Sequence, residues 1–296
     1  MDFSHIMLGT VQFGLPYGIN NHHGKPSLDQ VEKILRAAAD GGINVLDTAR
    51  NYEESEEVLG IVLTRSGLDK HFKIISKVKI FPDNLPPDDV QNWMRNSVET
   101  SLKMLKRDTL DGLLMHNEKD LAYCGLMKTM AEDLDWAPAT GSSLESVQGS
   151  PMEFIQSLDM AQIPCNILDR RFIAGAQAIK ARGGKVFARS VYLQGLLLKP
   201  AEEMDPKFAP VMAVRRQLEQ LSCEAGMMPA ELYFRYMLSL PEIDCVLTGV
   251  DTVEQLQENI RLASHGALSS DIIEEIRRIV PDLPENYLRP GLWNTL

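Results

Sequence analysis

The chain has 296 residues, of which 44% are hydrophobic and 24% charged, proportions that are typical of folded globular domains and not of disordered chains. Its formal net charge of -11 argues against binding to nucleic acid or to a membrane surface, because both attract clustered Lys and Arg. No segment reaches the ~20 apolar residues that cross a bilayer, and the first residues lack a signal-peptide pattern, so we expect a cytoplasmic protein.

The cysteines and histidines lack the spacing of a metal site. No C-x-x-C pair occurs and the cysteines are far apart, so we expect free, buried thiols. The adjacent His22 and His23 lie in a polar stretch, which is typical of an exposed loop. The sequence therefore predicts no metal ion. The four cysteines are Cys124, Cys165, Cys223 and Cys245.

Short apolar runs rich in β-branched residues alternate with amphipathic helical stretches along the chain, which predicts a parallel sheet. Eight such runs occur, the number that closes a (β/α)8 barrel, and no linker or repeat divides them. We therefore predict a single (β/α)8 (TIM) barrel domain over residues 1–296. The fifth run is the weakest, because it contains proline and glycine. The predicted strands cover residues 5–10, 44–49, 72–78, 110–116, 136–143, 160–166, 185–192 and 243–249.

Three of the predicted helices begin at recognisable caps. Ser27 and Gln30 have the spacing of a capping box, and Thr252 with Gln255 repeats it. Ser150 is followed by Pro151, where proline at the first helical position is well tolerated. Further helices are predicted at residues 55–66, 87–105, 121–133, 172–182, 213–225, 229–240 and 271–280.

Four polar residues stand at or just after predicted strand ends, where active sites of such barrels lie: Asp47, Tyr52, Lys77 and His116. Together they have the composition of a proton-transfer device. An ammonium beside a phenol stabilises the phenolate and should bring the pKa of Tyr52 down. A buried Lys77 needs a carboxylate partner, which Asp47 can be. His116 can donate a hydrogen bond that orients a carbonyl.

Two alternatives concern the lysine. Lys79 would point to the same strand face as Lys77, but it falls at the loop, where we expect it to be solvated. Lys77 could also form a Schiff base with a carbonyl substrate, as the lysines of barrel aldolases do. The neighbouring Asp47 and Tyr52 make this second alternative less economical.

These residues carry a resemblance to the aldo/keto reductase family. It rests on Gly9 and Thr10, the stretch from Asp47 to Glu56, Lys77 and His116, and it continues through residues 162–166, 188–190 and 249–259. The resemblance implies hydride transfer between a nicotinamide cofactor and a carbonyl, with Tyr52 as general acid/base. One departure is Glu53, where the family usually has glycine.

The sequence contains no G-x-G-x-x-G turn after the first strand, which disfavours a Rossmann cofactor site. The resemblance implies instead that NADP or NAD lies across the strand ends. Ser143 and Gln162 would then hold the carboxamide, although Leu144 replaces the family's asparagine, and Arg189 would stack on the nicotinamide. Ser190 and Gln194 would contact the pyrophosphate. The implied cofactor-binding residues are Gly9, Thr10, Asp47, Ser143, Gln162, Arg189, Ser190, Gln194, Gly249, Gln255, Glu258 and Asn259.

The adenosine end of the cofactor would fall at residues 249–259, where a helix N-terminus can hold phosphate. Family members that bind NADP usually have basic residues there. Here Asp251 is present and no Lys or Arg occurs before Arg261. We therefore expect NAD(H) to be accepted at least as well as NADP(H).

Gln12, Phe13 and Tyr17 follow the first strand and are expected to shape the substrate pocket. The C-terminal Tyr287 and Trp293 would either form a wall of this pocket or pack against the barrel. The methionines Met152, Met227 and Met228 are predicted to fill gaps in the core.

The function indicated is oxidoreduction of a small aldehyde, ketone or sugar. The alternative is a catalytically quiet barrel that binds NAD(P)H as a redox sensor or partner subunit, since fold does not fix function.

Overall fold

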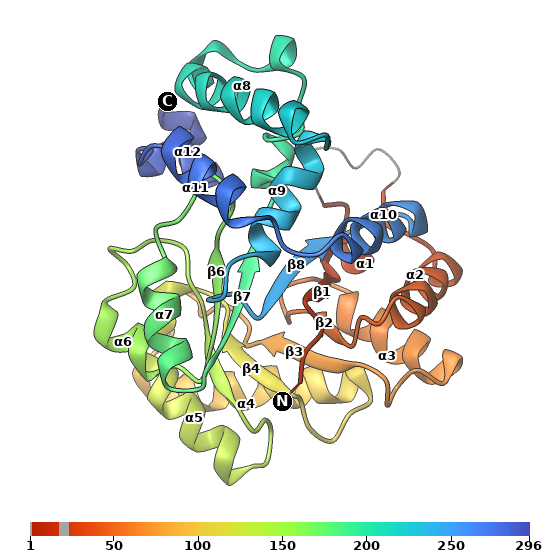
Figure 1. Ribbon diagram of the computed structural model, residues 1–296. Helices are drawn as coiled ribbons and strands as arrows, with labels where there is room; N and C mark the ends of the chain where they lie inside the picture. Colours follow the sequence, from red (N-terminus) through yellow and green to blue (C-terminus); the bar gives the residue numbers. More distant parts are fainter. Residues whose placement is uncertain (1, 18–23) are drawn as a thin grey trace.

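A computed structural model describes residues 2–17 and 24–296, and its eight parallel strands close into a barrel in chain order, as predicted (Figure 1). Residues 22–23, the predicted histidine loop, lie outside the described part. Each predicted interval contains one strand, which is shorter than the interval at one or both ends. The fifth begins only after Pro138, which cannot donate to the ladder. The strands are β1 Ile6–Gly9, β2 Val45–Asp47, β3 Lys73–Lys77, β4 Gly112–Met115, β5 Thr140–Ser143, β6 Met160–Pro164, β7 Lys185–Arg189 and β8 Cys245–Gly249.

Helices surround the barrel, and the arrows of β7 and β8 point toward the end where α8 and α12 lie (Figure 1). Short 3₁₀ turns precede α4 and α5 and account for the earlier starts expected from the sequence. The helices are α1 Val11–Gly14, α2 Leu28–Asp40, α3 Ser55–Ser66, α4 Val90–Leu105, α5 Cys124–Asp133, α6 Met152–Ser157, α7 Ile173–Ala181, α8 Ala209–Glu224, α9 Pro229–Leu238, α10 Val253–Ser264, α11 Ser270–Ile279 and α12 Glu285–Leu288.

Two of the three predicted caps form. The Ser27 hydroxyl accepts from the backbone N–H of Gln30, whose side chain accepts in return from the N–H of Ser27. Thr252 likewise accepts from the N–H of Gln255. The prediction at Ser150 was wrong: α6 begins one residue after Pro151 without a side-chain cap, because the Ser150 hydroxyl lies 3.5 Å from a Glu118 carboxylate oxygen instead.

The inside of the barrel is filled by one inward-facing side chain from almost every strand, in a cluster that is separate from the larger core between sheet and helices. Since side chains alternate along a strand, residues two positions beyond these point into the mouth of the barrel. The cluster contains Met7, Val45, Ile75, Leu114, Met160, Phe187 and Cys245.

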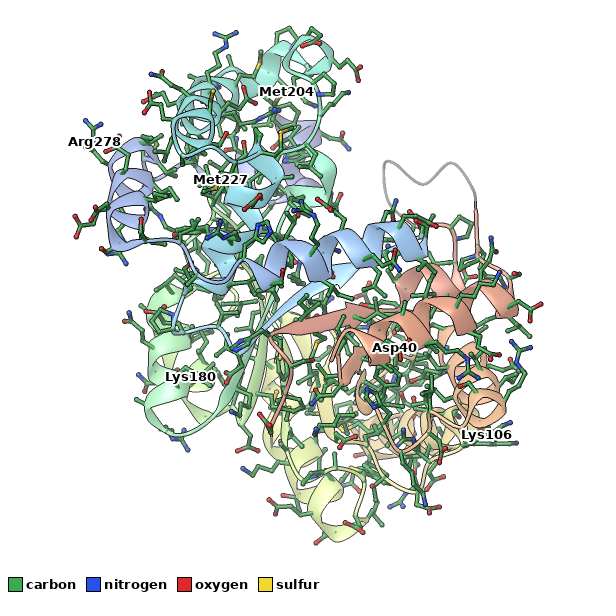
Figure 2. The ribbon with its side chains drawn as sticks, turned by 45° about the vertical axis from the view of Figure 1, so that its right-hand side comes forward. Asp40, Lys106, Lys180, Met204, Met227 and Arg278 are labelled. Carbon is green, nitrogen blue, oxygen red and sulfur yellow. The ribbon has the colours of Figure 1, made fainter. Side chains whose placement is uncertain are left out.

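The methionine prediction was only partly right. Met227 packs against the core near α8 and α9, where Figure 2 labels it together with Met204. Met228 is 71% exposed because it is the N-cap residue of α9, and Met152, the first residue of the short α6, is 43% exposed.

All four cysteines are free, as expected, but only Cys165 and Cys245 are fully buried, while Cys223 on α8 is exposed. Across residues 2–17 and 24–296, no group of three or more His, Cys, Asp or Glu side chains could hold a metal ion. Nor does any helix in these ranges have the length and apolarity needed to cross a membrane.

Candidate active site

A ring of residues at the carboxyl ends of the strands surrounds the mouth of the barrel. Each member except Ser143 lies two or four positions beyond an inward-facing residue of the inner cluster, so the alternation points it inward, and Ser143 is paired in register with the inward-facing Gln162. Six members have polar side chains, and two are glycines. The ring consists of Gly9, Asp47, Lys77, His116, Ser143, Gln162, Arg189 and Gly249.

Two neighbouring members of this ring, Lys77 and Asp47, form a buried ion pair. The Lys77 ammonium donates to Asp47 Oδ1 over 2.6 Å and to the carbonyl of Thr48 over 2.9 Å, and its side chain is 1% exposed. Gln162 donates a further hydrogen bond of 2.8 Å to the same carboxylate oxygen. The exposed Lys79 lies over the Trp93 ring instead. The structure thus brings Lys77, and not Lys79, to Asp47.

Tyr52 reaches this pair from the loop after β2. Its hydroxyl lies 3.4 Å from Lys77 Nζ. The loop is held by backbone hydrogen bonds, among them one from Arg50 N–H to the carbonyl of Lys77. Glu53, which follows the tyrosine, has φ of +46°, in the left-handed region that glycine adopts without strain. This explains the glycine of the resembling family, and this chain maintains the turn with a glutamate.

The pKa of Tyr52 differs from the sequence expectation. Burial raises the pKa of Tyr52 above that of a free phenol, and this effect exceeds the lowering by the charge of Lys77. Burial also acts to lower the pKa of Lys77, but Asp47 and Tyr52 together raise it. In the protein without ligand the pair is therefore a neutral phenol beside an ammonium.

His116 faces the tyrosine from the end of β4. The two ring centroids lie 5.6 Å apart at an interplanar angle of 88°. Burial, with the charges of Lys77 and Arg189, lowers the pKa of His116 to about 3. Its Nδ1 atom is buried and has no hydrogen-bond partner. The ring is therefore neutral at physiological pH, with a nitrogen free to bond a ligand.

This pKa predicts a pH dependence of stability. The unfolded chain protonates His116 below about pH 6.5, whereas the folded protein does not until about pH 3. The contribution of a neutral His116 to stability is thus complete above pH 6.5 and declines as the pH falls towards 3. We expect His116→Gln to remove this contribution. Urea unfolding of both proteins at pH 7 and pH 5 checks it: the stability of the parent should fall more than that of the variant, and equal losses would contradict the prediction.

The residues expected to hold a nicotinamide lie together on β5, β6 and β7. Ser143 Oγ is 3.4 Å from Gln162 Oε1. The Arg189 guanidinium donates to the carbonyl of Leu144 over 2.8 Å and pairs with the carboxylate of Glu145. Arg189 is thus fixed at the ring, and sequence reasoning missed Glu145, its partner.

The other predicted cofactor residues are divided between two loops and a helix. Ser190 and Gln194 both have φ above +50°, and Asn166 donates to the carbonyl of Ser190. The side-chain oxygen of Gln255, on the first turn of α10, accepts a hydrogen bond from the backbone N–H of Asp251. On α10, Glu258 is exposed and paired with Arg261, and Asn259 is partly buried. These predicted cofactor residues thus lie apart from the ion pair of Lys77 and Asp47.

Four residues after β1 that were predicted near the cofactor or the substrate have different environments. Thr10 donates its hydroxyl to the carbonyl of Asp47 and so joins the loops after β1 and β2. Phe13 is fully buried in the core, so the prediction that it shapes the pocket was wrong, whereas Tyr17 is exposed. Gln12 is buried with its amide oxygen unpartnered.

The C-terminal segment packs against the segments that follow β5 and β7. The Trp293 ring lies edge-on against Phe208 with a centroid distance of 5.1 Å. Arg289 lies 3.7 Å from the Glu145 carboxylate and 3.2 Å from that of Glu285. The segment is therefore tied by charge to the loop after β5, close to Arg189.

Comparisons with known proteins agree with this geometry. A family model described as the aldo/keto reductase family matches residues 5–281. The chain is 22% identical to the uncharacterized oxidoreductase YqkF of Bacillus subtilis (strain 168), over 94% of this chain and 92% of that protein. It is 25% identical to a probable voltage-gated potassium channel subunit beta of Arabidopsis thaliana, over 96% and 97% respectively. The solved holo form of the aldo-keto reductase AKR11C1 from Bacillus halodurans has a TM-score of 0.76 at 19% identity, over 95% of this chain and 93% of that one.

Proposed function

Since the chain belongs to the aldo/keto reductase family, we propose that it interconverts a small carbonyl compound, an aldehyde, ketone or sugar, with its alcohol by hydride transfer to or from a nicotinamide cofactor. The observation that carries this proposal is the Tyr52 hydroxyl 3.4 Å from a lysine that is itself ion-paired to a buried aspartate. We also propose that residues 1–296 act as one catalytic unit.

In this proposal Tyr52 moves the proton. In the direction of reduction its phenol donates to the carbonyl oxygen as negative charge develops there. The Lys77 ammonium then stabilises the phenolate, and Asp47 keeps Lys77 charged. A raised lysine pKa also disfavours the Schiff-base alternative, which needs a neutral amine. Neutral His116 would donate or accept a hydrogen bond at the substrate oxygen.

The residues around the mouth fit a nicotinamide dinucleotide. The cofactor supplies or accepts the hydride when bound. Ser143 and Gln162 offer a hydroxyl and an amide for its carboxamide, and the unpartnered buried Nδ1 of His116 points to a ligand at the same place. Arg189, Ser190 and Gln194 would contact the ring and the pyrophosphate, and the N-terminus of α10 would lie at the adenosine end.

The adenosine end predicts the cofactor preference. Glu254 and Glu258 are exposed on the first turns of α10, and Glu258 is paired with Arg261, the first basic residue of that helix. A 2'-phosphate would therefore meet carboxylates and no free guanidinium. We expect the dissociation constant of NADH to be equal to or below that of NADPH. Parallel titrations by intrinsic fluorescence quenching check this, and a hundredfold preference for NADPH would contradict it.

The test of the activity itself follows the same titrations. The better-bound reduced cofactor is mixed with a panel of aldehydes, ketones and aldoses, and its oxidation is followed by absorbance. Binding with turnover would support the proposal. A protein that binds neither cofactor would overturn it.

A second function is favoured by the similarity to a probable potassium channel subunit beta. In that case the chain would bind NAD(P)H without appreciable turnover and act on a protein partner. Binding without turnover of any carbonyl in the panel would support this second function.

A further inference from the structure

The two glycines of the ring create a notch in the mouth of the barrel. Gly9 and Gly249 are paired in register where β1 meets β8, so neither position contributes a side chain to the mouth, and beside Gly9 the space is bounded by the side chain of Leu247. The Gln12 amide occupies the space instead. A Cβ atom built on Gly249 would lie 2.5 Å from Gln12 Nε2 and 2.7 Å from Gln12 Oε1. Gln12 is therefore the polar group of this part of the ring, although it comes from α1.

The amide oxygen of Gln12 is buried without a hydrogen-bond partner. The residue is 7% exposed, and Oε1 is among the few buried side-chain oxygens of the described residues that have none. Thr248 Oγ1, on the strand beside it, is another. An unsatisfied buried acceptor destabilises a protein, and an apolar side chain of the same length would fill the notch without that penalty. A polar residue here is explained if a ligand supplies the missing donor.

We propose that Gln12 binds a hydroxyl group of the molecule held at the mouth of the barrel. An acceptor oxygen requires a donor, so phosphate and carboxylate groups, which are ionised, do not fit it. Hydroxyl groups do, and the proposed reaction, on which this inference rests, offers two sources: a ribose of the dinucleotide and a polyhydroxy substrate. Gln12 is thus a binding residue and takes no part in the proton transfer.

The decisive variant is Gln12→Met, which keeps the length of the side chain and removes the acceptor. Gln217→Met, at an exposed position on α8, is the matched control. We expect Gln12→Met to raise the melting temperature of the ligand-free protein, because it removes an unsatisfied oxygen. A purely structural glutamine would instead give a lower melting temperature and unchanged binding.

Binding is measured in two arms. Titration with NADH alone tests the ribose, and KM at saturating cofactor, for an aldose against a simple aliphatic aldehyde, tests the substrate. We expect Gln12→Met to raise either the dissociation constant of NADH or the KM of the aldose by about tenfold, because it removes a single hydrogen bond. A higher dissociation constant for NADH identifies the ribose, and a higher KM for the aldose alone identifies the substrate. No change in either arm overturns the inference while leaving the proposed function intact; absence of cofactor binding by the parent protein overturns both.

Gly249→Ala provides an independent variant at the same place. Its methyl group would displace the flexible Gln12 amide from the notch, so it should weaken the same arm as Gln12→Met. Because the two changes remove the same hydrogen bond, their losses of affinity should not add. The double variant should have the same dissociation constant or KM as the single variant that binds less tightly. Fully additive losses would overturn the placement of the ligand hydroxyl beside Gln12.

Discussion

Tyr52→Phe is expected to lower kcat/KM for carbonyl reduction by about 10²–10⁴, the contribution typical of a general acid. The change removes only the hydroxyl that lies 3.4 Å from Lys77 Nζ. The ring and its edge-on contact with His116 remain, so the fold and the dissociation constant of the cofactor should not change. Steady-state kinetics with a substrate from the panel, beside a cofactor titration, measure both quantities.

A matched control for this variant is Tyr236→Phe, which removes a hydroxyl from a tyrosine of α9 that lies in the core between sheet and helices and not in the ring at the mouth. It should have parental activity. Turnover by Tyr52→Phe within a few-fold of the parent would assign the proton transfer to another group, and the proposed mechanism would then be wrong.

Lys77→Met should be the most destabilising single change in the site. Removal of one partner from a buried ion pair leaves the other charge uncompensated, and such changes reduce the free energy of unfolding by about 3–5 kcal/mol. Here the Asp47 carboxylate would retain only the hydrogen bond from Gln162 among its side-chain partners. Denaturant unfolding of the parent and the variant gives the difference.

The double variant Lys77→Met with Asp47→Leu separates stability from activity. Replacement of both charges by apolar side chains should recover much of the lost stability, because no unpaired charge is left. Activity should stay low, since nothing would stabilise the Tyr52 phenolate. If Lys77→Met is as stable as the parent, the pair is not energetically coupled in the folded protein. A surface control is Glu99→Gln, which breaks an exposed pair with Arg95 and should change stability by less than about 1 kcal/mol.

A second buried pair was missed in the sequence and supports the same loop. The Glu56 side chain is fully buried, accepts from Ser76 Oγ over 2.7 Å and pairs with Arg50 over 2.5 Å. Ser76 precedes Lys77 on β3, so this contact ties the start of α3 to the strand that carries the lysine. The signal that could have found it is a charged pair inside the stretch from Asp47 to Glu56, whose partners become neighbours only when the loop folds back.

The sequence by itself determined the barrel and the identity of its polar mouth. Alternation of short apolar runs with amphipathic helices is a local pattern, and so is a polar residue at the end of such a run; both can be read without knowledge of the partners. This is why the sequence pattern predicts all eight strands and places Asp47, Tyr52, Lys77 and His116 at or just after strand ends. The pattern was weakest before β5, where Pro138 precedes the strand and the start differs most from the prediction.

Only the tertiary structure decided what surrounds these residues. Whether burial or Lys77 controls the pKa of Tyr52 depends on how much protein covers the phenol, and this is a property of packed loops. In the same way, Phe13 turns into the core while Gln12 reaches across to Gly249, although the two are adjacent in the sequence. Periodicity specifies the face that a side chain takes within an element, but desolvation and unpartnered atoms arise from segments that are distant along the chain, so no local pattern contains them.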